Sequence, residues 1–358
     1  MGHTYQAVQW NPQKKRYDQL VVGGVLLYLA VFMAVSAAVF PEATLETLLI
    51  RGLGTAALVL LHIILSIGPL ARRDPRWLPL LYNRRHLGVT MATVAFLHGA
   101  FSTLQFHAFG DVNPIVSLFT SNTRVDSIAQ FPFQPLGACA LVIVVLMAAT
   151  SHDFWLRNLS APVWKALHML VYVAYALILL HVALGSLQTE SGTVTPAALG
   201  LGAVWLGALH LRAARAEGAC DREEEVREAA AAEGWMDACG VDEIPEGRAK
   251  VVVAAGDRVA IFRSEGHLSA LSSVCQHQNG PLGEGRVVDG LVVCPWHGFQ
   301  YRPRCGTSPE PFDERVPTFR VRVEDGRVLL DPRPLPLGTE TDPVPVSSAV
   351  SSAGSSPA

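Results

Sequence analysis

Six apolar stretches in the first 211 residues constrain the fold of this chain more than any other feature. They cover residues 20–40, 48–71, 86–109, 135–151, 164–187 and 196–211, of which the fourth and the sixth are short. A helix needs about 20 apolar residues to cross the hydrocarbon core of a bilayer. Half of the 358 residues are apolar and only 16% are charged, which is unusual for a soluble protein. The sequence therefore predicts a bundle of six transmembrane helices over residues 20–211.

Lysine and arginine residues between these stretches are divided unevenly between the two sides of the membrane. One side holds twelve of them, and the other side holds only Arg51 and Arg124. Positive residues favour the cytoplasmic side, so we expect both termini in the cytoplasm of an integral, multi-pass protein of the bacterial inner membrane. A signal peptide is the alternative for the first stretch, which follows Lys14, Lys15 and Arg16. Its apolar run is longer than a typical signal core, and we interpret it as a helix.

The rest of the chain divides by composition. Residues 1–19 form a cytoplasmic N-terminal segment, and residues 212–234 form a charged, alanine-rich linker. Residues 235–333 contain short β-branched runs broken by turns, which predict an all-β domain. Residues 334–358 are rich in Pro, Ser and Ala, and we expect them to be disordered. The predicted fold class is α + β multidomain, with the six-helix bundle followed by the all-β domain.

Charge and cysteine content exclude two classes of protein. The net charge is −3 and no basic stripe dominates a soluble stretch, so we expect no nucleic-acid partner. Of the six cysteines, only Cys275 and Cys294 lie beside histidines at the spacing of metal ligands. A disulfide framework is therefore not expected.

A candidate metal site lies in the all-β domain. Cys275 and His277 form a Cys-x-His pair, and Cys294 and His297 form a Cys-x-x-His pair. Between the pairs, Asp-Gly at residues 289–290 separates two apolar runs, which predicts a hairpin that brings the pairs together. Two thiolates and two imidazoles can bind Zn²⁺ tetrahedrally. They can also hold a Rieske [2Fe-2S] cluster, in which two histidines ligate one of the two irons.

The loops of this site resemble the Rieske ferredoxin family from about residue 235 to residue 331. The resemblance implies a [2Fe-2S] cluster held by the two cysteines and two histidines. In the Rieske proteins of quinol:cytochrome c reductases an extra cysteine in each loop forms a disulfide, whereas Gly280 and Trp296 stand at the matching positions here. Those proteins also have a serine where this chain has Phe299. The loss of that hydroxyl predicts a reduction potential towards the low end of the Rieske range.

Five histidines lie within or at the edge of the predicted spans, where ionisable side chains are costly and by default functional. They are His62, His86, His98, His168 and His181. His86 and His98 are twelve residues apart and His168 and His181 thirteen, which is about 18 and 20 Å along a helix. Such a ladder would hold two b-type haems, with His86 facing His168 near the inside and His98 facing His181 nearer the outside. Neither pair shares one helix face, so a kink, a π-bulge or sideways haem placement is needed.

The surroundings of these histidines resemble the ferric reductase-like transmembrane domain, including the haem subunit of periplasmic methionine sulfoxide reductase systems, over residues 20–211. The resemblance rests on "SIGPLARR", "RRHLG…AFLHG" and "VWKALHMLVYVAYALILLH". It implies one or two b-type haems, with His98, His168 and His181 among the ligands. His86 stands where some members have an apolar residue, which leaves either His86 or His62 as the inner ligand.

Together the two resemblances imply an oxidoreductase-type protein for transmembrane electron transport. It would connect a cytoplasmic Rieske cluster to intramembrane haem, a cytoplasmic redox partner, and a periplasmic or quinone redox partner at the outer face. Two alternatives stay open. The first is a ferric or metal-chelate reductase or a quinol-linked reductant of a periplasmic partner, and the second is a redox or iron sensor. The sequence leaves open whether the chain is itself an enzyme.

Overall fold

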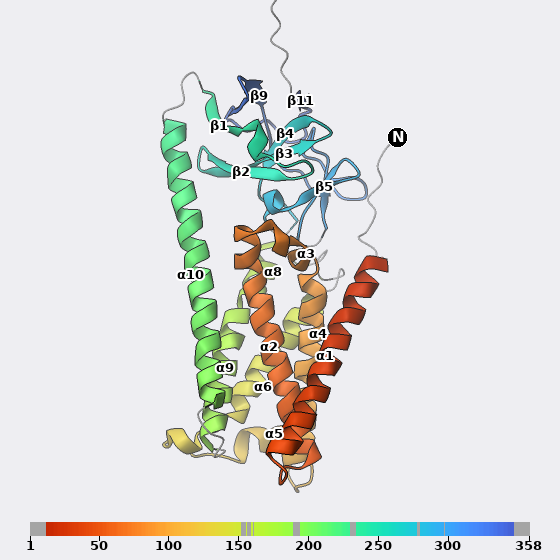
Figure 1. The fold of residues 1–358 in the computed structure, drawn as a ribbon, viewed down its shortest axis with the longest axis vertical. Helices are drawn as coiled ribbons and strands as arrows, with labels where there is room; N and C mark the ends of the chain where they lie inside the picture. The colour runs from red at the N-terminus through yellow and green to blue at the C-terminus, as the bar shows by residue number, and fades with distance from the viewer. Residues whose placement is uncertain are drawn as a thin grey trace, which may run out of the picture. The chain divides into compact units, whose positions relative to one another are not determined.

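The computed structural model describes residues 12–151, 155, 159, 161–188, 194–229, 234–277, 280–296 and 298–346. The chain divides into two compact units. The helical unit is Trp10–Ala213, and the β unit, which includes Ala214–Ala358, contains the strands. Figure 1 labels the helices and strands of both units.

The described part of the helical unit is built from helices joined by turns (Figure 1). Local signals set several helix starts. The side chain of Thr44 accepts the N–H of Thr47 at the start of α2, and Asn113 followed by a proline starts α5. The helices are α1 (Pro12–Val39), α2 (Leu45–Arg73), α3 (Leu78–Tyr82), α4 (Arg84–His107), α5 (Pro114–Thr120), α6 (Gln134–Thr150), α8 (Ala161–Met169), α9 (Val171–Gln188) and α10 (Val194–Ala229).

Five helical segments in the described part of the chain are long and apolar enough to cross a membrane, whereas the sequence predicted six. They are Lys14–Val39, Leu45–Arg73, Arg84–His107, Val163–Ser186 and Pro196–Ala216. The predicted fourth span is α6, an apolar helix of 17 residues. At about 26 Å, this helix is a little shorter than a hydrocarbon core of about 30 Å. The expectation of six full-length spans is therefore corrected to five and one shorter apolar helix.

The fifth predicted span has a one-residue irregularity near its start. Helix α8 ends at Met169 and α9 begins at Val171, with Leu170 as a turn between them. The N–H of Leu170 donates to the Leu167 carbonyl at 3.2 Å, the tighter spacing of a 3₁₀ turn. The break separates the helical segments that carry the two histidines of this span.

Helix α10 continues well beyond the end of the last predicted span. It is a single helix of 36 residues, so residues 212–229 of the expected linker are helical. Ala, Glu and Arg dominate this stretch and are strong helix formers. Residues 230–233, the end of the expected linker, lie outside the described part of the chain.

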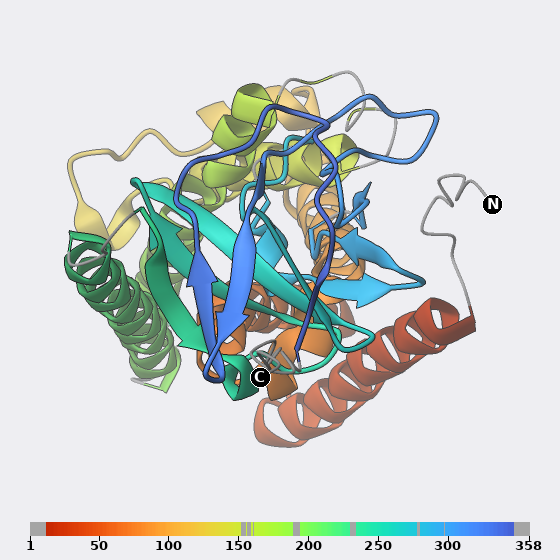
Figure 2. The same cartoon turned by 90° about the horizontal axis from the view of Figure 1, so that it is seen from above.

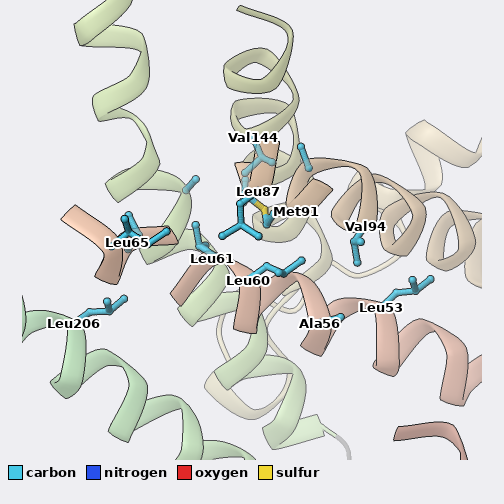
Figure 3. Packing of buried hydrophobic residues seen from close by; sticks show 14 of the residues in the cluster. Leu53, Ala56, Leu60, Leu61, Leu65, Leu87, Met91, Val94, Val144 and Leu206 are labelled. Carbon is cyan, nitrogen blue, oxygen red and sulfur yellow. The ribbon is translucent and has the colours of Figure 1, made fainter. Parts of the chain in front are cut away.

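Helix α2 lies at the centre of the helical unit. Half of its most apolar window is buried, whereas none of the corresponding window of α1 is. Figure 3 shows the side chains of the buried cluster that α2 forms with α4, α6 and α10. Its labelled members are Leu53, Ala56, Leu60, Leu61, Leu65, Leu87, Met91, Val94, Val144 and Leu206. This packing fixes the helices that carry the candidate haem ligands around a common core.

The β unit contains three sheets whose strands all pair antiparallel, which agrees with the predicted all-β domain. Strands β9 and β10 lie side by side as a blue hairpin in Figure 2. The first sheet is β1 (Met236–Gly240), β10 (Arg327–Leu330) and β9 (Val321–Glu324). The second is β11 (Val344–Pro345), β4 (His267–Ser272), β3 (Asp257–Ser264) and β2 (Ala249–Ala254), with β8 (Thr318–Phe319) paired to β4. The third is β5 (Arg286–Val288), β6 (Leu291–Val293) and β7 (Gln300–Tyr301).

The hairpin predicted around the Asp-Gly dipeptide is formed by β5 and β6. Val288 pairs with Leu291, which leaves a two-residue turn. Asp289 and Gly290 have φ angles of 50° and 74°, as a type I′ turn requires. Because Cys294 directly follows β6, the hairpin brings the second ligand loop back towards the first.

Residues 334–346, which we call the strap, fold against the β unit. We expected disorder over residues 334–358, and for the strap this expectation is wrong. The N–H of Leu335 donates to the Thr318 carbonyl at 2.9 Å, and β11 pairs Val344 with Leu268 of β4. Backbone hydrogen bonds to a sheet edge hold this segment, and composition does not reveal them. Residues 347–358 lie outside the described part of the chain.

Candidate functional site

The two cysteines of the predicted cluster site come together in the β unit. Cys275 and Cys294 are 1% and 2% exposed and belong to one buried cluster. Each is held by its own loop: the N–H of Cys275 donates to the Gly280 carbonyl at 2.9 Å, and the N–H of Cys294 donates to the Phe299 carbonyl at 2.8 Å. The backbone of each loop therefore fixes its thiol.

The first histidine of the site, His277, is stacked against an aromatic ring. The ring centroids of His277 and Phe299 are 4.6 Å apart and the ring planes differ by 8°. Phe299 in turn contacts the rings of Tyr301 and Phe312. Predicted ligand His297 lies outside the described residues. Within the described ranges, no three His, Cys, Asp or Glu side chains converge on one metal centre.

Gly280 keeps space open beside the cysteine sulfurs. A Cβ atom at this position would lie 2.7 Å from Sγ of Cys294 and 3.3 Å from the ring of Trp296. Side chains do not tolerate the first of these distances, so the position requires glycine. Two buried thiols, an adjacent imidazole and a glycine beside the sulfur fit the donor set of a Rieske cluster.

Tyr301 was not predicted as a site residue from the sequence, yet it contacts Cys275, a predicted cluster ligand. Its hydroxyl oxygen lies 3.3 Å from Sγ of Cys275 and accepts the backbone N–H of Gln276 at 3.0 Å. Tyr301 is fully buried. Burial, followed by the Cys275 thiol, raises the pKa of this phenol. The hydroxyl therefore stays protonated and can donate to the sulfur.

In the helical unit, His98 of α4 and His181 of α9 face each other. Their ring centroids are 6.3 Å apart and their planes are inclined at 82°. Two metal–nitrogen bonds of about 2 Å, plus about 1 Å from each nitrogen to its ring centre, place two imidazoles on one metal about 6 Å apart. The spacing fits two axial ligands of one haem iron.

Backbone carbonyls orient both of these rings. Nδ1–H of His98 donates to the Ile50 carbonyl and Nδ1–H of His181 donates to the Phe133 carbonyl, each at 2.9 Å. A carbonyl only accepts, so the proton is on Nδ1 and the lone pair is on Nε2. A neutral ring with a free Nε2 lone pair is the form that binds a metal.

His62 is placed differently from this pair. Its Nδ1–H donates to the Leu58 carbonyl of its own helix at 2.9 Å, and its Nε2 accepts the hydroxyl of Tyr175 at 3.1 Å. Tyr175 lies on α9 between the two histidines of the fifth predicted span, and we did not predict this contact. The nitrogen that would bind iron is therefore already engaged in the structure.

His168 and His86 have separate local partners. Nδ1–H of His168 donates to the Trp164 carbonyl at 3.0 Å, and the Trp164 ring stacks on the imidazole with centroids 3.7 Å apart. Nε2 of His168 lies 3.3 Å from the Ser151 hydroxyl. Nδ1 of His86 lies 2.8 Å from a carboxylate oxygen of Asp18 on α1. A carboxylate on Nδ1 is the usual partner of a histidine that binds metal through Nε2.

Both units match known families. Residues 234–320 match the Rieske [2Fe-2S] domain, and residues 51–179 match the ferric reductase like transmembrane component. Both resemblances predicted from the sequence are thereby confirmed.

Ferredoxins of bacterial oxygenase systems are among the relatives. This chain is 32% identical over 103 residues to the ferredoxin component of the alkene monooxygenase system of Xanthobacter autotrophicus, covering 28% of this chain and 84% of that protein. It is 38% identical over 97 residues to the biphenyl dioxygenase ferredoxin subunit of a Pseudomonas species, covering 26% of this chain and 88% of the subunit. Most of each ferredoxin is therefore represented in this chain.

A haem-binding membrane protein is also a relative. The chain is 36% identical over 132 residues to the protein-methionine-sulfoxide reductase heme-binding subunit MsrQ of Herminiimonas arsenicoxydans. The match covers 37% of this chain and about half, 55%, of that subunit. The chain therefore belongs to the Rieske [2Fe-2S] family, and it joins this cluster domain to a multi-pass helical domain that matches the ferric reductase like transmembrane component.

Proposed function

We propose that this protein carries electrons across the membrane between a cytoplasmic Rieske cluster and a b-type haem held by His98 and His181. A redox partner at the outer face exchanges electrons with the haem side. The observation that carries the proposal is the 6.3 Å separation of the two imidazoles, each with Nδ1 directed to a carbonyl. Such a pair suits a low-spin haem with no open position for substrate, which is the usual arrangement of an electron carrier.

Four side chains would hold the cluster, which supplies one-electron chemistry when bound. We assign Cys275 and Cys294 to one iron and His277 and His297 to the other. In this assignment the Tyr301 hydroxyl donates a hydrogen bond to a ligand sulfur at 3.3 Å. The buried Phe299 ring excludes water from one face of His277.

We assign the orientation of the chain in the membrane from the distribution of its positive residues. Twelve Lys and Arg lie on the side that we assign to the cytoplasm, against two on the other side. A second haem on the cytoplasmic side would take His168 with His86. His86 is favoured over His62 because Asp18 holds its Nδ1, whereas Nε2 of His62 accepts the Tyr175 hydroxyl.

The outer redox partner is more consistent with a protein than with a free ferric chelate. The relative of the membrane unit is the haem-binding subunit of a protein-methionine-sulfoxide reductase. That name supports a partner enzyme as the acceptor, with this chain as its reductant. A ferric reductase and a redox sensor are the two alternative functions that the experiments must exclude.

An anaerobic potentiometric titration of the purified full chain tests the two cofactor sites. Haem is followed by its optical bands and the cluster by electron paramagnetic resonance. His181→Ala should remove the low-spin haem step of the His98 and His181 site and keep the cluster signal, and Cys294→Ser should keep that haem step and remove the cluster signal. Zinc in place of the cluster refutes the cytoplasmic half of the proposal, and a low-spin haem content that is unchanged in His181→Ala refutes the ligand pair.

A vesicle assay then tests the transmembrane step. The wild type in vesicles with trapped ferricyanide should pass electrons inwards from an external reductant that does not cross the bilayer. Both variants should lose this activity. A wild type with both cofactors but no transmembrane flow would favour the sensor.

A further inference from the structure

Four histidines of the described membrane helices donate Nδ1–H to a backbone carbonyl, and they do so in two ways. His62 and His168 each donate to a carbonyl four residues earlier in their own helix. His98 and His181 instead donate to a carbonyl of a neighbouring helix, in both cases 48 residues earlier in the chain. Among these four, only the two facing histidines donate Nδ1–H to a carbonyl outside their own helix.

A glycine lies four residues after each of these acceptor carbonyls. Gly54 follows Ile50 on α2, and Gly137 follows Phe133 at the start of α6. In an α-helix the carbonyl of residue i points at the N–H of residue i+4, so the Cα of the glycine borders the acceptor oxygen. The N–H of Gly137 donates to the Phe133 carbonyl at 3.4 Å, so this oxygen serves both the helix and the histidine.

Both glycines are in direct contact with the histidine rings. A Cβ at Gly54 would lie 2.9 Å from Cε1 and 3.0 Å from Nδ1 of His98. A Cβ at Gly137 would lie 2.6 Å from Nδ1 and 2.7 Å from Cε1 of His181. Any side chain at these positions would push the ring away from its carbonyl.

The third close contact between a glycine and a histidine has the opposite orientation. A Cβ at Gly202 of α10 would lie 2.5 Å from Nε2 of His62. Here the glycine packs against the nitrogen that a metal would need. The Gly54 and Gly137 contacts lie nearest the Nδ1 and Cε1 side of the ring and are compatible with an open Nε2.

We infer that Gly54 and Gly137 are positioning residues of the haem site, each forming with its carbonyl a notch that sets the depth and orientation of one axial histidine. The inference rests on the proposed His98 and His181 ligation. The two notches are related by a constant offset of 83 residues, which takes Ile50, Gly54 and His98 onto Phe133, Gly137 and His181. Equivalent contacts on the two sides of the iron would hold the imidazole rings with their centroids 6.3 Å apart and their planes inclined at 82°.

Alanine substitutions at the two glycines test the inference on the full-length protein. We expect Gly137→Ala to lose most of its haem, or to keep haem whose low-spin ferric resonance has a changed g spread, because that spread depends on the angle between the two imidazole planes. Gly54→Ala should change the same resonance less, since its Cβ contact is longer. The Rieske signal of each sample reports how much folded protein is present.

Two further glycines serve as controls. Gly88→Ala on α4 meets no atom within 4 Å and should have wild-type haem content and resonance. Gly202→Ala introduces the shortest of the three contacts but at His62, and it should also keep the haem resonance. Haem content and g spread that stay at wild-type values in both Gly54→Ala and Gly137→Ala overturn the inference. So does a Gly202→Ala effect equal to theirs, because it would show a general packing effect.

The outcomes separate this inference from the proposed function. If His98→Ala keeps the wild-type content of low-spin haem, the ligand assignment itself is wrong. If His98→Ala loses the haem while the glycine variants retain the wild-type spectrum, the ligands stand and the notches are refuted. If Gly137→Ala does not accumulate with its Rieske signal, the milder Gly54→Ala decides.

Discussion

The hydroxyl oxygen of Tyr301 lies 3.3 Å from the sulfur of Cys275, and both residues are almost completely buried. The same hydroxyl accepts the Gln276 N–H at 3.0 Å, so its own proton is available to the sulfur. A ligand sulfur that accepts a hydrogen bond carries additional negative charge more easily. The contact therefore favours the reduced form of the cluster.

Tyr301→Phe should lower the reduction potential of the cluster. A net hydrogen-bond contribution of about 0.5–1.5 kcal/mol corresponds to a shift of about 20–65 mV for one electron. A redox titration followed by electron paramagnetic resonance measures the shift. Tyr175→Phe, which removes a hydroxyl from the helical unit, is the control and should leave the cluster potential unchanged. An unshifted potential in Tyr301→Phe would mean that the sulfur does not accept this hydrogen bond.

Gly280→Ala should disrupt cluster retention. Its Cβ would lie 2.7 Å from Sγ of Cys294, so either the sulfur or the loop must move. We expect less iron and acid-labile sulfide per protein and a broadened cluster resonance. Gly240→Ala is a matched control in the same unit, because its nearest neighbour would be an oxygen of Glu243 at 3.5 Å, an ordinary contact. Equal cluster content in the two variants would contradict the steric argument.

Cys239 should be unreactive in the folded protein. The residue is 1% exposed, and burial, followed by the charge of Glu243, raises the pKa of its thiol to about 11. At pH 8 roughly one thiol in a thousand is then ionised, and the thiolate is the reactive form. Alkylation with iodoacetamide, read by peptide mass spectrometry, should modify Cys239 only after unfolding in urea. Rapid modification of the native protein would show that this strand opens readily.

Asp331→Asn should destabilise the β unit by about 1–3 kcal/mol. Asp331 is 2% exposed and accepts hydrogen bonds from Arg333 at 2.8 and 2.9 Å. The exposed Asp342, which pairs with Arg304 at 3.3 Å, provides the control, and Asp342→Asn should leave the unfolding temperature unchanged. Thermal loss of the visible absorption of the cluster reports unfolding of the unit.

The effect of Asp331 should depend on pH in a defined direction. Hydrogen bonding to Arg333 lowers the pKa of this carboxyl below its ordinary value, and stabilisation from such a group is present above the ordinary value. It is lost as the pH falls through the lower value of the folded state. The difference between the wild type and Asp331→Asn should therefore be constant near neutral pH and shrink below about pH 4. A difference that grows on acidification would contradict this assignment.

Features with local causes were predictable from the sequence. The Asp289-Gly290 turn follows from two residues that tolerate positive φ, and its hairpin was correctly predicted. Helix α2 and its neighbours follow from apolar run length. The same hairpin predicted that Cys275 and Cys294 lie close together, and the structure places both in one buried cluster.

Features with tertiary causes were missed. The sequence did not reveal the Gly54 contact with His98, because the two residues lie on different helices and glycine is common in membrane spans. The break at Leu170 has no proline or glycine to mark it. The contact of Tyr175 with His62 joins residues 113 positions apart. Each depends on how helices pack, which the pattern within one helix does not specify.

The strap matters for any fragment of the protein that contains only the β unit. By pairing Val344 with Leu268, and through the Val346 N–H that donates to Gly266 at 2.9 Å, it closes one edge of the second sheet. An open sheet edge is a template for pairing with another chain and promotes aggregation. A fragment cut at residue 333, where the family match has already ended, would expose that edge. A fragment intended to stay monomeric in solution should extend through Val346.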